Sequence, residues 1–302
     1  MSWHDILIQQ LINGLTIGMV YALIALGYTM VYGIINLINF AHGEIFMVGA
    51  YLAWSLFTVT ISAGEARGIA LLFLILAGFI VGMAGCGVLG VAIERVAYRP
   101  LRNAPRLAPL ITAIGVSFFL QNAVMLLYGA SDKSFPSLFP HYSFYIGQAS
   151  VTGLQILIVA VSIALMLVLH YFIKLSKMGK ALRATSQDLK TASLMGIDVN
   201  RIISLCFLIG SSMAAAGGVM FGMYYNTINF HDGYIAGLKA FTAAVLGGIG
   251  NVAGAMLGGV VIGLIEGLCA CYISSQWKNV FAFIILVLIL LFKPTGLLGE
   301  KK

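Results

Sequence analysis

The chain has 302 residues, of which 61% are hydrophobic or aromatic and only 9% are charged. A soluble domain carries about 25% charged residues, so this composition excludes a soluble globular protein and indicates several membrane spans. The net charge of +7 does not indicate nucleic-acid binding, because most Lys and Arg residues lie in three segments between or after apolar runs: 95–106, 174–201 and 293–302. This is the pattern of cytoplasmic loops.

The first apolar run begins just after the N-terminal sequence MSWHD and continues almost unbroken to Gly33. It is too long for the core of a signal peptide, so it predicts a retained first helix. With nine crossings the charge distribution would place the N-terminus outside, whereas with eight crossings one end would change side. The longest non-cytoplasmic loop is then 129–152, which contains Pro136, Pro140 and several aromatic residues.

Nine segments meet or approach the length of about 20 apolar residues that a membrane-crossing helix needs. They are residues 8–32, 40–61, 69–93, 108–128, 153–173, 202–224, 234–249, 252–273 and 279–292. The seventh is short, rich in glycine and contains Lys239, which is typical of a broken or re-entrant helix. We therefore expect an all-α polytopic membrane protein with eight or nine transmembrane helices, folded as one domain over residues 1–302.

A polar cluster separates the first two apolar runs, where Asn36, Asn39, His42 and Glu44 lie within nine residues. Polar groups inside a bilayer must find partners in protein or in a wet cavity, so this cluster indicates a pathway through the membrane. A structural interpretation is equally compatible with the pattern. Asn39 would cap a helix that begins near Ala41, with Glu44 in its first turn.

A similar tripeptide follows the sixth apolar run. Ile38-Asn39-Phe40 is followed by Ala, His and Gly, and Ile228-Asn229-Phe230 is followed by His231, Asp232 and Gly233. Five crossings separate the two tripeptides, and an odd number inverts the topology, as in transporters built from inverted repeats. An inverted repeat and a chance match of three residues are both open at this point.

Three other charged residues fall in or near apolar runs. Lys239 and Asp232 are seven residues apart on one helix face, so they either pair or, as we favour, Lys239 snorkels to an interface. Glu94 is interpreted as a solvated charge at a helix end. Glu266 is interpreted as a packed polar contact rather than a substrate ligand. The candidate pathway residues are thus Asn36, Asn39, His42, Glu44, Asn229, His231, Asp232 and Lys239.

The four cysteines, Cys86, Cys206, Cys269 and Cys271, all lie in apolar runs. We interpret them as small buried hydrophobic residues rather than metal or redox ligands, and we expect no metal site. Glycines spaced by four residues, as in 250/254/258 and 259/263/267, predict closely packed helix faces.

The basic segment 174–201 contains an apolar stripe with mixed spacing of three and four. The pattern predicts a short amphipathic helix at 186–195 that ends at Gly196. Such a helix could lie on the lipid surface. Its apolar residues include several small ones, however, which favours insertion into a groove of another protein.

Four motifs carry a resemblance to a known family. They are ASLMGI from Ala192, GYTMVYGIINLINFAHGEIFMVGAYLA from Gly27, KAFTAAVLGGIGNVAGAMLGG from Lys239 and KPTGLLG from Lys293. Together they cover nearly the whole chain in order, and the sequence resembles the LivH-type permease subunits of the branched-chain amino-acid ABC transporter family. The resemblance implies a bacterial inner (plasma) membrane protein with several spans that translocates branched-chain amino acids by alternating access.

The resemblance also implies partners. These are two cytoplasmic ABC ATPases, a LivM-type second permease and a periplasmic substrate-binding protein. The chain has no G-x-x-x-x-G-K-[ST] phosphate loop, so we expect no enzymatic activity and no cofactor in this chain, with ATP bound by the partner subunits. The segment 174–201 would be the coupling loop, with contacts to the ATPase from Gly179, Arg183, Ala184, Asp188, Ala192, Met195, Gly196 and Ile197.

Alternatives stay open. Related permeases carry urea or short amides, and sequence separates them poorly because the binding protein does most of the selecting. An ion-coupled carrier or channel would have more intramembrane carboxylates than Glu44, Asp232 and Glu266. An intramembrane enzyme would need a motif such as H-E-x-x-H, which the sequence lacks. A permease that receives its substrate from a binding protein needs no tight site, so we expect a mostly apolar, weakly polar channel.

Overall fold

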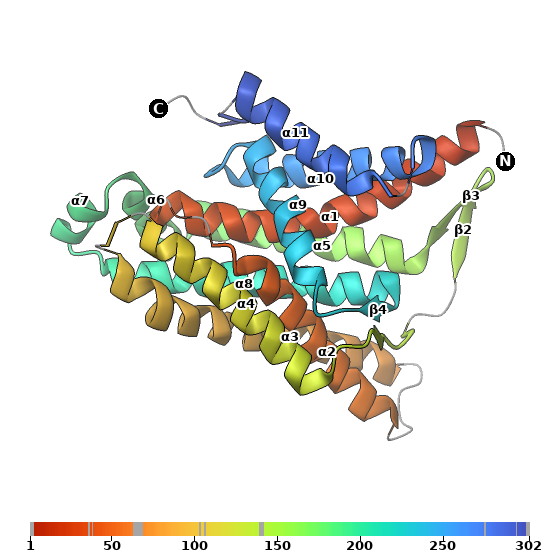
Figure 1. Cartoon of the computed structure of the whole chain (residues 1–302), viewed down its shortest axis with the longest axis horizontal. Coiled ribbons are helices and arrows are strands. Elements are labelled where there is room, and N and C mark those ends of the chain that lie inside the picture. The colour runs from red at the N-terminus through yellow and green to blue at the C-terminus, as the bar shows by residue number, and fades with distance from the viewer. Residues whose placement is uncertain are drawn as a thin grey trace.

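The protein is an assembly of helices with two small two-stranded sheets (Figure 1). The computed structural model describes residues 3–35, 37, 39–62, 69–102, 104–105, 107–138, 142–274, 276–293 and 295–299. Its helices are α1 (Trp3–Ile35), α2 (His42–Ser62), α3 (Ile69–Ile93), α4 (Leu107–Tyr128), α5 (Gly153–Leu175), α6 (Lys177–Gln187), α7 (Leu189–Leu194), α8 (Val199–Tyr225), α9 (Asp232–Gly247), α10 (Val252–Tyr272) and α11 (Lys278–Phe292).

The strands are short. They are β1 (Lys133–Ser134), β2 (Ser143–Ile146), β3 (Ala149–Thr152) and β4 (Thr227–Ile228). β1 pairs antiparallel with β4, and β2 pairs antiparallel with β3. A π-helical turn (Glu94–Tyr98) and a 3-10 turn (Arg99–Leu101) continue α3.

The predicted polytopic all-α fold is confirmed, and each of the nine predicted segments is a helix. Within the described ranges, seven helices are long and apolar enough to cross a membrane, while α11 is a shorter apolar helix. The seventh predicted segment, α9, is continuous rather than broken. It has 16 residues and, at 1.5 Å per residue, is about 24 Å long. It ends where Gly248 adopts a positive φ of 106°.

The two ends of the molecule differ in charge as the sequence predicts. Helices α6 and α7 and the turns after α3 lie at one end with the C-terminus, whereas the N-terminus and the β2–β3 hairpin lie at the other (Figure 1). The described parts of the three basic segments therefore share one end, which is the cytoplasmic end by the charge rule.

The helices form two groups with matching contacts, α1–α4 and α8–α11. Helix α1 packs on α10 as α8 packs on α3, and α2 contacts α4 as α9 contacts α11. Helix α1 runs toward the cytoplasmic end while α8 runs away from it (Figure 1). The arrangement supports the inverted-repeat interpretation, with α5, α6 and α7 connecting the two repeats.

The central helix of the molecule is α1, which packs against α10 through small residues. A β-carbon on Gly18 would lie 2.9 Å from the Val260 Cα, and one on Gly14 would lie 2.8 Å from the Gly263 backbone oxygen. Neither contact leaves room for a side chain, so the predicted close packing of glycine faces is observed here.

Two interpretations of single residues are wrong. Glu94 is not a solvated end charge. It is fully buried, forms an ion pair with Arg102, and accepts a hydrogen bond from Ser204 Oγ at 2.7 Å, because α3 continues into the turns that bring Arg102 back over it. The cysteines are also not all buried: Cys86 and Cys206 are, but Cys269 is partly exposed and Cys271 is exposed, since the end of α10 lies at the surface.

Candidate functional site

Both Ile-Asn-Phe segments form the same turn before a helix. Asn39 Oδ1 accepts a hydrogen bond from the Ala41 backbone N–H at 3.1 Å, and Asn229 Oδ1 accepts one from the His231 backbone N–H at 2.8 Å. The short amide side chain closes each turn on its own backbone. Asn39 therefore closes a turn just before α2, which begins at His42, and Tyr98 Oη also donates to this oxygen at 2.8 Å.

The two turns lead into helices α2 and α9, whose first turns are in direct contact. A β-carbon on Gly237 would lie 2.9 Å from the Gly43 Cα, and one on Gly233 would lie 2.8 Å from the Gly43 oxygen. Gly43 and Gly233 each stand four residues after the Asn of their turn. The polar clusters that the sequence analysis singled out in separate halves thus meet at one place in the fold.

His42 and Glu44 are both buried in the first turn of α2. The imidazole packs edge-on against Tyr28 at 4.7 Å between ring centres, and its Nε2 has no hydrogen-bond partner among the described residues. Glu44 Oε1 accepts a hydrogen bond from Ser117 Oγ at 3.1 Å. Glu44 Oε2 is buried and, within the described ranges, has no partner.

Helix α4 and the loop after it contribute polar partners to this region. Gln121 Nε2 is hydrogen-bonded to His231 Nδ1 at 2.7 Å, and Asn229 Nδ2 donates to Asp132 Oδ1. Together with the Ser117–Glu44 pair, these contacts form a line of three between α4 with the loop after it and the segments that begin α2 and α9. We name this line the polar seam. The seam leads from buried Glu44 to exposed Asp132 at the external end.

The sequence analysis missed the seam residues on the α4 side, namely Ser117, Gln121 and Asp132. A signal was present, because Ser117 and Gln121 are four residues apart on one face of an otherwise apolar helix. Asp232 belongs to the turn itself, where its Oδ2 accepts a hydrogen bond from the Asn229 backbone N–H at 2.7 Å.

Lys239 lies outside the polar seam, and both sequence interpretations of it are wrong. It neither snorkels nor pairs with Asp232. It is buried, and its Nζ donates to Glu266 Oε1 at 2.7 Å and to Tyr21 Oη at 3.2 Å. Glu266 is thus a packed polar contact, as predicted. Its second oxygen accepts from Tyr21 Oη at 2.9 Å. Asn36 lies outside the described residues.

The cytoplasmic segment contains two helices where one was predicted. The break falls at Asp188, whose side chain accepts a hydrogen bond from the Lys190 backbone N–H at 3.0 Å and caps α7. A hydrogen bond from the Thr191 hydroxyl and the Lys190 N–H together hold the pKa of the Asp188 carboxyl below its ordinary value. Gly196 ends the segment with a positive φ of 83°, as a helix-ending glycine does.

The predicted coupling residues divide by exposure. Gly179 and Ala192 are buried and Ile197 is partly buried, while the others are exposed: Arg183, Ala184, Asp188, Met195 and Gly196. The break at Asp188 means that the predicted apolar stripe does not form one face. Leu194 and Met195, 86% and 79% exposed, are the prominent apolar side chains at the tip.

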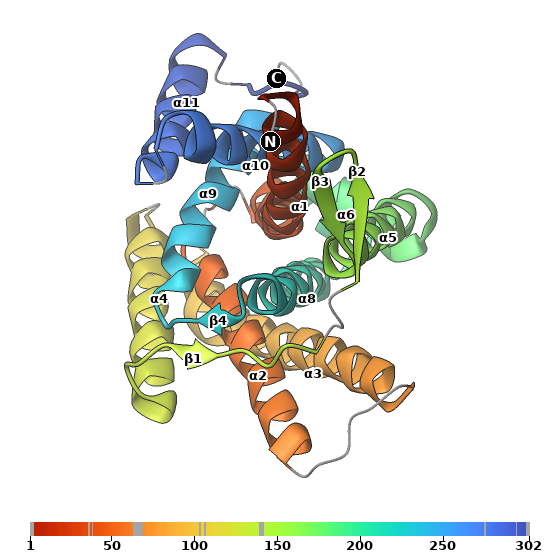
Figure 2. The ribbon, with the colours of Figure 1, turned by 90° about the vertical axis from the view of Figure 1, so that its right-hand side faces the viewer.

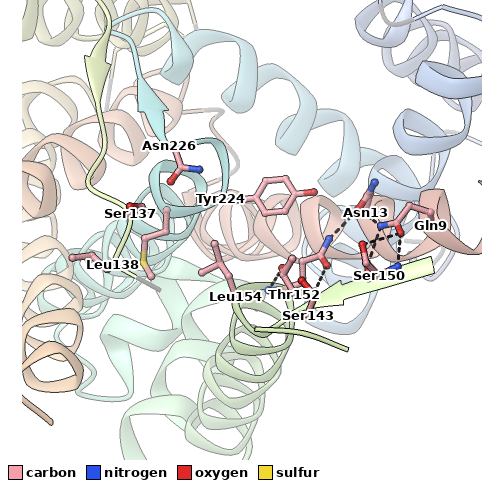
Figure 3. Close-up of a pocket in the computed structure, with 12 residues that line it drawn as sticks. Gln9, Asn13, Ser137, Leu138, Ser143, Ser150, Thr152, Leu154, Tyr224 and Asn226 are labelled. Carbon is pink, nitrogen blue, oxygen red and sulfur yellow. Dashed lines mark hydrogen bonds between the residues drawn. The ribbon is translucent and has the colours of Figure 1, made fainter. Parts of the chain in front are cut away.

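A cavity of about 360 Å³ lies at the external end, beside the β2–β3 hairpin (Figure 3). Gln9, Asn13 and Gln155 line it and also fasten the hairpin and α5 to α1. Gln155 Nε2 donates to Asn13 Oδ1 at 2.9 Å, and the Ser150 backbone N–H donates to Gln9 Oε1 at 2.8 Å. The hairpin and α5 lie on the opposite side of the molecule from α4 (Figure 2), so this cavity is separate from the polar seam.

Comparison with known proteins gives a match over almost the whole chain. The family model described as "Branched-chain amino acid transport system / permease component" matches residues 10–290. The chain is 49% identical to the high-affinity branched-chain amino acid transport system permease protein LivH of Escherichia coli K12 and 50% identical to BraD of Pseudomonas aeruginosa. Each match covers 98% of this chain and 96% of the relative.

A more distant relative has the same kind of name. The chain is 28% identical to a probable branched-chain amino acid transport permease protein LivH of Methanocaldococcus jannaschii, over 92% of this chain and 88% of that protein. No solved structure matches the chain significantly.

Proposed function

Because this chain belongs to the family of permease components of branched-chain amino acid transport systems, we propose that it is the permease subunit of an ABC importer that carries branched-chain amino acids across the bacterial inner membrane. The observation that carries the proposal is the match to relatives of this name over 98% of the chain. As a transport subunit it would catalyse no reaction itself. It would work with two cytoplasmic ATPases that bind ATP, a LivM-type second permease and a periplasmic binding protein.

The polar seam is the proposed route for substrate. The seam and the two turns beside it contain six of the eight residues that the sequence marks as pathway residues, all but Asn36 and Lys239. The seam reaches the external end at His231 and Asp132. Helix α4 forms one side of the seam. If α4 moved away, the polar groups of the seam would hydrogen-bond to substrate or water instead of to each other.

The tip of α7 is the proposed contact with an ATPase. Its support is the exposure of Leu194 and Met195 at the basic end of the molecule (Figure 1). Lipid binding is less consistent with the structure, because the apolar residues of 174–201 do not form one continuous face.

The test is transport by the purified complex. The chain would be expressed with the two ATPases and the second permease, and the complex would be inserted into liposomes and supplied with the binding protein. We expect uptake of radiolabelled leucine that requires ATP on the side of the membrane where the ATPases lie. Leucine uptake by the chain alone would disprove the ABC mechanism, and uptake of urea in preference to leucine would disprove the assigned substrate.

A further inference from the structure

Three glutamates are buried among the described residues, and they differ in their partners. Glu94 is paired with Arg102, and Glu266 is paired with Lys239. Glu44, only 1% exposed, has no cationic partner in the part of the chain that the structure describes. A buried carboxylate without a cation is costly, and ionisable groups inside a membrane protein are retained where they serve function.

The two oxygens of Glu44 have different surroundings. Oε1 is fixed by the Ser117 hydroxyl. Oε2 has no hydrogen-bond partner among the residues that the structure describes, and it lies so close to Gly233 that a β-carbon there would overlap it. The carboxylate also stands in the first turn of α2, where the positive end of the helix dipole favours negative charge. One oxygen of the Glu44 carboxylate is therefore held in place and the helix end favours its negative charge, but no cation among the described residues neutralises it.

Access to this oxygen depends on α4. The hydroxyl that fixes Glu44 is on α4, and one turn further toward the external end Gln121 closes the seam against His231. These polar contacts can be exchanged for hydrogen bonds to water or substrate. Movement of α4 away from α2 and α9 would open a route to Glu44 along the seam.

We propose that Glu44 Oε2 binds the α-ammonium group of an amino acid as it moves along the polar seam. This inference rests on the proposed function and adds the group that recognises substrate. A charged N–H donor and a carboxylate make one of the stronger hydrogen bonds in proteins. The ammonium must lose water to enter, which offsets part of this gain, so the contact selects for the amine without holding the substrate tightly.

The first test is Glu44→Gln in the complete transporter. Glutamine keeps the size of the side chain and the contact with Ser117, but it removes the negative charge. We expect ATP-dependent leucine uptake to fall about tenfold to a hundredfold, the range for one charge-assisted hydrogen bond. Assembly should be unchanged and the melting temperature equal or higher, because a buried unpaired charge is removed. The matched control is Asp198→Asn, which also replaces a carboxylate by an amide but at an exposed side chain outside the polar seam, and its uptake should stay close to wild type.

Two results would overturn the assignment. Wild-type uptake by Glu44→Gln would mean that the charge is not used. A melting temperature that falls in parallel with uptake would mean that Glu44 only stabilises the fold. In both cases leucine uptake by the wild-type complex would leave the proposed function standing, whereas its failure in the wild type would remove the proposed function itself.

A second measurement addresses the amine directly. Leucine uptake would be measured with added 3-methylbutylamine, which keeps the ammonium group, or 3-methylbutanoate, which keeps the carboxylate. Any effect on the binding protein is the same for wild type and variant, so a difference between them comes from the permease. We expect the amine to inhibit the wild type at least several-fold more strongly than Glu44→Gln. Equal inhibition of both would contradict the inference.

Discussion

The buried pair of Lys239 and Glu266 shows how single residues join distant helices. Both side chains are at most 4% exposed, and they connect α9 to α10, with Tyr21 of α1 bonded to both. Glu266→Gln would leave the Lys239 ammonium buried without a carboxylate. We expect a loss of about 3–5 kcal/mol in the free energy of unfolding, measured as a lower melting temperature of the purified protein in detergent.

The control for this prediction is the exposed pair of Arg201 and Asp198. Asp198→Asn should change stability by less than about 1 kcal/mol, because solvent screens an exposed pair. The double variant Lys239→Met with Glu266→Leu should recover most of the loss, since both buried charges are removed and Lys278, which also contacts Glu266, is partly exposed. A wild-type melting temperature for Glu266→Gln would show that the pair does not hold these helices together.

What the sequence predicts at this scale depends on the distance to the partner. The polar turn at Asn39 is predictable because its hydrogen-bond partner is two residues away. The partner of Lys239 is not, because Glu266 is 27 residues away. Glu94 pairs with Arg102, only eight residues away, but its burial also depends on α8, whose Ser204 is 110 residues away. Local spacing cannot show contacts that only helix packing creates, so the sequence assigned both residues to solvent or an interface.

At the scale of elements, the contact between α2 and α9 is set by glycine. Gly233→Ala would place a β-carbon against the Gly43 oxygen and the Glu44 carboxylate. Such overpacking costs about 1–3 kcal/mol, and it would also move Glu44. We expect a lower melting temperature together with reduced leucine uptake.

Helix α4 offers a matched control for this substitution. A β-carbon on Gly115 would meet nothing within 4 Å, so Gly115→Ala should keep the melting temperature or raise it slightly through its better helix propensity. If Gly233→Ala behaved like Gly115→Ala, the two repeats would not be in close contact at this point.

The cytoplasmic helix α7 depends on its two ends. Gly196→Pro would remove both the positive φ of 83° and the backbone hydrogen bond from Gly196 to the Ser193 oxygen. We expect the α7 tip to lose its shape, so that the ATPase no longer co-purifies with a membrane-inserted chain. Leu189→Ala, a change on the same helix away from its C-terminal end, is the control. Normal recovery of the ATPase with Gly196→Pro would remove α7 as the coupling element.

The cap at Asp188 gives a prediction about pH. Its pKa is lowered in the folded protein, so its contribution to α7 is complete above the ordinary pKa of about 3.9. That contribution is lost only as the pH falls through the still lower folded value. ATPase association measured between pH 5 and 8 should therefore not change through this residue. An association that weakened toward pH 5 in wild type but not in Asp188→Asn would contradict this.

The same segment shows which feature of the helices could not be predicted from the sequence. The apolar spacing correctly indicated helix and an end at Gly196, but not the break at Asp188. Aspartate is compatible with a helix interior as well as a cap, and the capping bonds to Lys190 and Thr191 decide between the two. Seven of the nine apolar segments were predictable because their runs have the length that a bilayer requires.

At the scale of the whole molecule, the inverted repeat explains why the two sequence clusters form one site. Two repeats of opposite orientation bring equivalent turns together near their common axis, which is where Gly43 and Gly233 touch. The two matching tripeptides suggested this relation, but only the contacts of α1 with α10 and of α3 with α8 distinguish a repeat from a chance match.

The orientation of the whole chain is the last prediction. The basic segments share the end that carries α6 and α7 (Figure 1), so this end should face the cytoplasm, with the β2–β3 hairpin outside. Ser137→Cys and Gln187→Cys place exposed thiols near opposite ends of the chain's long axis. Both would be made with Cys269 and Cys271 replaced by serine, since Cys86 and Cys206 are buried. A membrane-impermeant maleimide should label Ser137→Cys in intact cells but Gln187→Cys only after lysis. The background protein without either new thiol is the control, and labelling in the reverse order would place the α7 tip outside and exclude a cytoplasmic ATPase as its partner.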